Sequence, residues 1–137
     1  MSLFNVIDVA GSAMNAQSVR LNVTASNLAN AGSVSGDQDK VYRSRQPVFE
    51  SFEKTLASQD GVTGVRLTNI VESSAPLSMR YQPDHPEADE HGNVYVSNVN
   101  TVEEMVNMIS ASRSYKNNVE IINTTKDLLL QTLSLGR

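Results

Sequence analysis

Residues 3–31 read LFNVIDVAGSAMNAQSVRLNVTASNLANA, and this stretch decides the fold. Its apolar positions recur at alternating intervals of four and three residues, the spacing of a helix that packs against other helices. Only Asp8 and Arg20 are charged, although a solvated helix face normally carries more Lys and Glu. We therefore predict a long helix with neighbours on more than one side. Its contact stripe comprises Leu3, Ile7, Ala10, Met14, Gln17, Leu21, Thr24, Leu28 and Ala31.

Residues 101–134 show the same rhythm and predict a second long helix. Thr101 is followed three positions later by Glu104, the spacing of a reciprocal capping box at a helix start. Gly136 lies just beyond the last apolar position and is expected to end the helix. The predicted contact stripe comprises Met105, Met108, Ser112, Tyr115, Val119, Ile122, Lys126, Leu129 and Leu133.

Between the two helices the helical rhythm is lost. Residues 33–40 are rich in Ser, Asp and Gly and predict a loop. Segments near 41–53, 62–72, 77–82 and 93–97 are rich in Val, Tyr, Phe, Leu and Ile and predict a small antiparallel β element. The expected fold is α+β, with an N-terminal core helix in 1–32, a loop and small β-rich domain in 33–100, and a C-terminal core helix in 101–137.

The dimensions of these parts do not match a self-contained globule. Each helix would be about 45 Å long, and roughly seventy residues between them cannot cover both along their length. Aromatic residues, which bury the most area, make up only 5% of the 137 residues, so the core should be thin. Either the helices pair within one molecule, or neighbouring copies complete their packing.

Composition also excludes several classes of function. The net charge of −4 and the lack of a basic cluster argue against a nucleic-acid partner. The absence of cysteine excludes disulfides, a thiol nucleophile and thiolate metal sites. The aliphatic run Leu128–Leu130 is far too short to span a membrane. No Lys or Arg precedes Arg20 and Asp8 interrupts the apolar segment, so we expect no cleaved secretory signal peptide.

One segment concentrates groups that are capable of metal binding or acid–base chemistry. It permits a metal-dependent enzyme that uses Asp84, His85, Asp89 and His91 as an alternative. Pro83 and Pro86 make the segment an extended turn, so a solvated acidic loop is the favoured interpretation. Neither a glycine-rich nucleotide cradle nor a serine-nucleophile motif is present in the sequence. We predict no catalytic residue, no metal and no cofactor.

Asparagine recurs in both predicted helices. A buried amide between helices fixes their register, because a slipped pairing leaves its polar groups unsatisfied. The alternative is that these residues are simply exposed, and the sequence leaves the two open. The residues in question are Asn22, Asn27, Asn30, Asn107, Asn117, Asn118 and Asn123.

Two sets of strings make the chain recognisable. SAMNAQ at 12–17 with Arg20, followed by ASNLANA at 25–31, resembles the N-terminal signature of bacterial flagellar rod and hook proteins. YQPDHPEADEHGNV at 81–94, with NVN at 98–100, EMVNM at 104–108 and ASRSY at 111–115, resembles the proximal-rod members of the flagellar basal-body rod family. Ser97 departs from this pattern, because the family often has Pro there.

The resemblance implies a non-enzymatic structural subunit of the proximal rod. Such subunits polymerise with copies of themselves and other rod proteins into the drive shaft that transmits torque from motor to hook. It further implies a rod that crosses the periplasm, export through the flagellar type III apparatus without a cleaved signal peptide, and no nucleic acid, small-molecule substrate or membrane span. A soluble helical-hairpin binding module remains an alternative.

The implied sites are contacts rather than catalytic groups. A family-motif turn is expected at Pro83, His85, Pro86, Asp89 and Gly92. The expected assembly interface comprises Leu3, Ile7, Met14, Leu21, Asn27, Leu28, Asn30, Met105, Met108, Tyr115, Val119, Ile122, Leu129 and Leu133.

Overall fold

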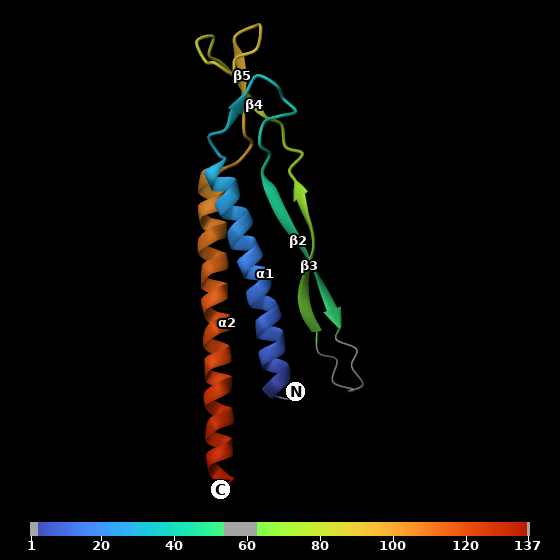
Figure 1. Cartoon of the computed structure of the whole chain (residues 1–137), viewed down its shortest axis with the longest axis vertical. Coiled ribbons are helices and arrows are strands. Elements are labelled where there is room, and N and C mark those ends of the chain that lie inside the picture. Colours follow the sequence, from blue (N-terminus) through green and yellow to red (C-terminus); the bar gives the residue numbers. More distant parts are fainter. Residues whose placement is uncertain (1–2, 54–62, 137) are drawn as a thin grey trace.

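The fold was obtained as a computed structural model, which describes residues 3–53 and 63–136. Two long terminal helices lie side by side and antiparallel, so that both chain ends lie at the same end of the molecule (Figure 1). The predicted α+β fold is confirmed. In chain order the elements are α1 (Leu3–Ala29), β1 (Val34–Ser35), β2 (Arg45–Glu53), β3 (Thr63–Glu72), β4 (Ser78–Tyr81), β5 (Asn93–Val96) and α2 (Thr101–Leu135).

Strands β2 and β3 form an antiparallel two-stranded ribbon with a bulge between Val48 and Phe49. The ribbon lies along α1, so α1 is placed between α2 and the ribbon (Figure 1). The backbone N–H of Val65 donates a hydrogen bond of 3.2 Å to Oγ of Ser12 on α1. Gly64 permits this approach, because a Cβ there would lie 3.2 Å from the same oxygen. The ribbon therefore covers a second side of α1, as the low charge of this helix indicates.

A three-stranded antiparallel sheet in the order β1-β5-β4 lies beyond the end where α1 stops and α2 starts (Figure 1). Val94 of the central strand β5 is fully buried. The prediction that residues 33–40 are all loop is wrong for two of them: Val34 pairs with Val96, and Ser35 with Tyr95. The two-residue strand β1 forms because it pairs with the edge of β5, and this partner is far away in the sequence.

The predicted capping box of α2 is also wrong. Asn100 is the N-cap, and its side chain accepts hydrogen bonds from the backbone N–H groups of Val102 at 3.1 Å and Glu103 at 3.4 Å. Glu104 does not reach back to Thr101, because its carboxylate is turned inward and is bound by α1. At the other end Gly136 is the C-cap, as predicted.

The core is thin, and its buried apolar residues in the described chain are mostly small. The molecule exposes 9459 Å², whereas a compact monomer of 14.9 kDa would expose roughly 7,000 Å². The chain thus has about a third more surface than a globule of its mass. The buried apolar residues are Ala10, Ala16, Val23, Val41, Val94 and Ala111.

Helix α2 is longer than α1, with 35 residues against 27, and it continues past the start of α1 (Figure 1). Asn27 lies opposite Glu104, so the start of α1 lies opposite about residue 128 when both helices rise equally per residue. We call residues 128–135 the overhang. Leucines cover most of its circumference, since successive residues turn by about 100°, while Gln131 and Ser134 lie on the remaining side. Leu128, Leu130, Leu133 and Leu135 are exposed.

Candidate assembly interface

The face of α2 turned toward α1 follows a regular alternation of four and three residues, but it is rotated from the predicted stripe. Of the predicted positions, Met108, Tyr115, Ile122 and Leu129 are half-buried. Met105 and Leu133, in contrast, are 50% and 70% exposed, and Lys126 is exposed. Val119 and Ser112 lie at the edge of the contact and are half-buried. The positions that sequence reasoning missed on this face are Glu104, Ala111, Asn118 and Thr125.

The rotation has two physical causes, both in the first turns of α2. Ala111 is completely buried, and its small side chain permits close approach of the two helix backbones. Glu104 is only 5% exposed, because its carboxylate is anchored to α1. A prediction from large apolar residues therefore identifies only some of the residues of α2 that pack against α1, and it overlooks the small and polar ones.

The predicted stripe of α1 corresponds more closely to the structure. Ala10 and Thr24 are buried, while Leu3 lies near the start of the helix and is exposed. The stripe leaves out Ala16, Val23 and Asn27, which are also buried, although Asn27 is in the expected assembly interface. A single stripe could not include them, because α1 has neighbours on two sides. The half-buried members of the predicted stripe are Ile7, Met14, Gln17, Leu21, Leu28 and Ala31.

Asn27 is the centre of a buried polar network where α1, α2 and β2 meet. Its Nδ2 donates to the carbonyl oxygen of Arg45 at 2.8 Å and to Oε1 of Glu104 at 3.0 Å. Its Oδ1 accepts from the backbone N–H of Arg45 and from the hydroxyl of Tyr42, both at 2.9 Å. We call Asn27, Tyr42, Ser44, Arg45 and Glu104 the polar junction.

The junction decides between the two interpretations of the asparagines. Asn27 is 1% exposed and bridges three elements, so here the amide does fix the register. Asn107 is half-buried and accepts from Nη2 of Arg20 at 3.4 Å, a second polar link between the helices. Asn30 donates to Ser26 within its own segment. Asn118 likewise donates within α2. The asparagines that are exposed are Asn22, Asn117 and Asn123.

The family-motif turn is held together by its own polar groups. The carboxylate of Asp89 accepts from the backbone N–H groups of Asn93 at 2.7 Å and His91 at 2.9 Å. These hydrogen bonds, that of Asn93 foremost, hold the pKa of Asp89 below its usual range against an opposing effect of burial. Nδ1 of His85 accepts from the N–H of Glu87 at 3.1 Å. The acidic and imidazole groups thus shape the turn before β5.

The end of this turn requires glycine. Gly92 has a φ of 77°, the left-handed region, and a Cβ there would lie 3.0 Å from both Pro83 and the ring of Tyr81. Pro86 lies exposed in the same turn. In residues 3–53 and 63–136 no three His, Cys, Asp or Glu side chains are grouped so that they could hold a metal ion.

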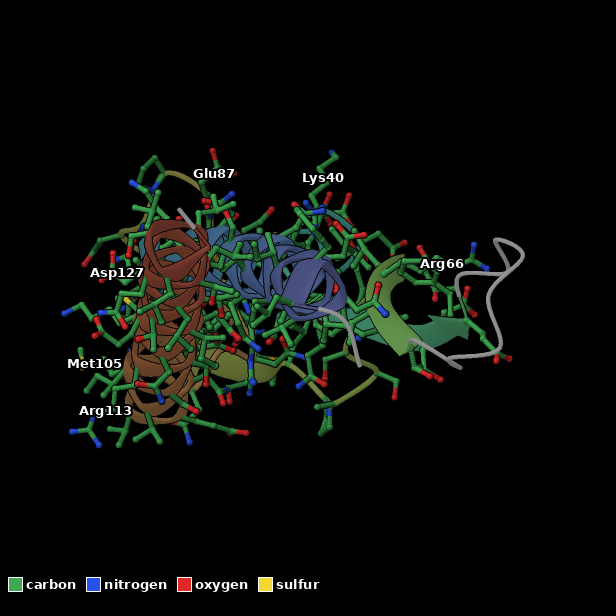
Figure 2. The ribbon with its side chains drawn as sticks, turned by 90° about the horizontal axis from the view of Figure 1, so that it is seen from below. Lys40, Arg66, Glu87, Met105, Arg113 and Asp127 are labelled. Atoms are coloured by element: carbon green, nitrogen blue, oxygen red, sulfur yellow. The ribbon has the colours of Figure 1, made fainter. Side chains whose placement is uncertain are left out.

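The outer face of the first turns of α2 is apolar and has no partner within the described chain. Val102, Met105, Val106 and Ile109 are between 50% and 68% exposed, and we call them the α2 patch. Met105 points away from α1, on the same side as Arg113 and Asp127 (Figure 2). An exposed apolar patch of this kind is typical of a contact surface. Within the described residues, no helix is long and apolar enough to cross a membrane.

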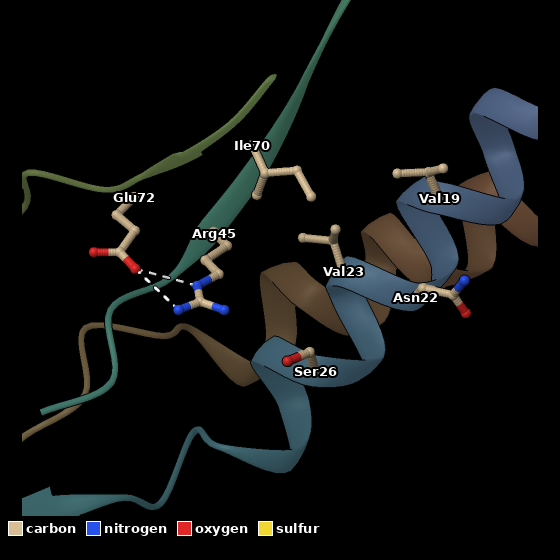
Figure 3. A pocket seen from close by; sticks show the side chains of 7 residues that line it. All are labelled: Val19, Asn22, Val23, Ser26, Arg45, Ile70 and Glu72. Carbon is tan, nitrogen blue, oxygen red and sulfur yellow. Dashed lines mark hydrogen bonds and ion pairs between the residues drawn. The ribbon is translucent and has the colours of Figure 1, made fainter. Parts of the chain in front are cut away.

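A groove of about 480 Å³ opens between α1 and the ribbon (Figure 3). Val19 and Val23 of α1 face Ile70 of β3 across it. Nη2 of Arg45 and Oε1 of Glu72 form an ion pair of 3.1 Å at one end (Figure 3). The α2 patch and this groove are the two surfaces that the sequence analysis did not identify as units.

Comparison with known proteins gives a consistent result at both ends and over the full length. Residues 7–36 match the family described as "Flagella basal body rod protein", and residues 90–135 match "Flagellar basal body rod FlgEFG protein C-terminal". The flagellar basal-body rod protein FlgC of Yersinia enterocolitica is 52% identical, with all of both chains covered. FlgC of Salmonella typhimurium is 49% identical, again over all of both chains. FlgC of Buchnera aphidicola from Acyrthosiphon pisum is 42% identical over 99% of each.

Proposed function

Because the chain belongs to the FlgC family of flagellar basal-body rod proteins, we propose that its terminal helices complete their packing against neighbouring rod subunits. The protein is a structural component of the proximal rod and not an enzyme. The observation that supports the packing proposal is the overhang. Its leucines cover most of the circumference of a helix that has no partner there within the described chain.

Surface area supports the same proposal. The accessible surface of the chain exceeds that of a compact monomer by about 2,400 Å². An interface of standard size buries about 800 Å² on each partner, so the excess equals about three such interfaces. A free monomer gains nothing from the apolar side chains in this surface, whereas a subunit surrounded by others removes them from water. The neighbours are other subunits of the basal-body rod, and we propose that they include copies of this chain.

The predicted interface residues then divide into three groups. Leu3, Met105 and Leu133 are exposed in the single chain and contact neighbours directly. Asn27 belongs to the polar junction, and Asn30 to the turn that follows α1. The remaining residues are half-buried and hold α1 against its neighbours in the chain while their outer edges face the next subunit: Ile7, Met14, Leu21, Leu28, Met108, Tyr115, Val119, Ile122 and Leu129.

The finer features of the role rest on what rod proteins of this family share. We propose that the assembled rod crosses the periplasm and transmits torque from motor to hook. The chain reaches it through the flagellar type III export apparatus without a cleaved signal peptide. Residues 33–100 form the domain outside the helical core, and the turn at 83–92 shapes the way into β5 and α2.

Substitution in the overhang tests the proposal without disturbing the fold of the single chain. Leu133→Asp places a charge on a side chain that is 70% exposed, so the helical content measured by circular dichroism should stay unchanged. Rod assembly and motility should be lost, because the carboxylate would be buried among apolar neighbours. Gln131→Asp, at an exposed polar position of the same overhang, is the control and should assemble. Normal assembly and motility of Leu133→Asp would contradict the proposal.

A further inference from the structure

The α2 patch and the groove lie on opposite flanks of the molecule. Met105 of the patch points away from α1 (Figure 2), and the groove lies between α1 and the ribbon (Figure 3). We propose that the α2 patch of one copy packs into the groove of a second copy of this chain. The inference rests on the proposed function and names one of the contacts that complete the packing.

The two surfaces lie at the same height along the molecule. Asn27 contacts Glu104 at 3.0 Å, and Arg20 contacts Asn107 at 3.4 Å. These links place the groove wall of α1, residues 19–26, beside the stretch of α2 that carries the patch, residues 102–109. Each stretch covers about 12 Å of helix. A neighbour displaced sideways, without a shift along the long axis, thus brings its patch level with the groove.

The chemistry of the two surfaces matches as well. The four side chains of the patch are all uncharged and apolar. The groove is lined by Val19, Val23 and Ile70 beside the polar Asn22 and Ser26, so burial removes apolar area from water on the patch and, mainly at Ile70 and Val19, in the groove. The cationic Arg45 at the groove end is already paired with Glu72. A helix with charged side chains would therefore find no unpaired charge of Arg45 or Glu72 to bind in the groove, whereas the apolar patch needs none.

The contact also has the directionality that a polymer needs. A patch that meets a different surface leaves one free patch and one free groove on each pair, so that further copies can be added around a ring or along a helix. A patch that met itself would close a dimer and stop. A contact between the patch of one copy and the groove of the next is therefore favoured over a contact between two patches.

Cross-linking in assembled rods tests the contact, and the chain contains no cysteine of its own. Val106→Cys lies in the patch, and Asn22→Cys lies at the groove; both positions are exposed. They lie on opposite flanks of one molecule, so a short bis-maleimide links them only between copies. Rods built from the double variant should yield a series of covalent multimers, and rods of either single variant should yield none.

The controls separate this contact from general proximity in a rod. Asp127→Cys lies on the same side of α2 as Met105 (Figure 2) but about 30 Å further along the helix from Val106, so its pair with Asn22→Cys should not cross-link. If the double variant does not assemble, coexpression of the two single variants tests the same contact and should give a covalent dimer.

The outcomes distinguish the two proposals. Assembled rods without cross-links between positions 22 and 106 overturn the patch-in-groove contact and leave the proposed function intact. Dimers of Val106→Cys alone also overturn it, because the patch then meets itself. Absence of the wild-type chain from purified rods would overturn the proposed function, and this inference with it.

Discussion

At the scale of single residues, the side chain of Asn27 takes the place of a backbone partner. Its amide binds both the N–H and the carbonyl of Arg45, the first residue of β2, as a neighbouring strand would. The same Nδ2 group also holds Glu104 of α2. Because Asn27 is 1% exposed, water cannot replace these hydrogen bonds, and one amide connects helix, strand and helix.

Removal of this amide should be costly. Asn27→Ala leaves the buried backbone groups of Arg45 and the carboxylate of Glu104 without their partner, and we expect a loss of about 3 kcal/mol in the free energy of unfolding. Urea denaturation of the purified chain, followed by circular dichroism, measures this loss. Asn15→Ala, at an exposed position of the same helix, should change stability by no more than about 0.5 kcal/mol. Equal effects of the two substitutions would disprove the role given to Asn27.

At the scale of elements, the spacing of apolar residues predicted where the helices and most of the strands lie, because local interactions determine these ranges. Both helices and four of the five strands lie close to the ranges expected from apolar periodicity and turn residues. The rotation of α2 by about one position was not predictable, because it depends on the contact of Glu104 with Asn27, 77 residues away in sequence. The same holds for the N-cap of α2, where the inward turn of Glu104 leaves the role to Asn100.

The face of α2 that the structure assigns to α1 can be tested at Ala111. Ala111→Leu adds volume where the side chain is completely buried, so overpacking should lower the free energy of unfolding by about 1–3 kcal/mol. Ser110→Leu, the neighbouring exposed position, is the matched control and should have little effect. Thermal unfolding followed by circular dichroism compares the two, and an unaffected Ala111→Leu would place a different face of α2 against α1.

At the scale of the whole molecule, the chain is a component with its apolar surface left partly open. Its core is thin and its surface exceeds that of a compact protein by about a third. The low aromatic content indicates this already, but sequence alone does not locate the open surfaces. They lie on the outer side of α2, along the overhang and between α1 and the ribbon.

Hydrogen exchange should reveal this difference between free and assembled chain. In the purified protein, backbone amides of residues 129–135 should exchange rapidly, because no part of α1 lies opposite them and the helix end can fray. Amides of residues 108–118, which pack against α1, should be protected both in the free chain and in the rod. Incorporation into the rod should slow exchange selectively in the overhang; an overhang already protected in the dilute monomer would contradict the expectation.

The polar junction has a mechanical consequence for a shaft under load. A one-turn slip of α1 along α2 corresponds to about 5.4 Å, and it would break the hydrogen bonds that cross between the two helices, from Asn27 to Glu104 and from Arg20 to Asn107. Shear between the helices is therefore resisted mainly at the junction end, where Asn27 meets Glu104 and Arg20 meets Asn107. The opposite end, with its overhang, is left compliant and can adjust to the subunits around it.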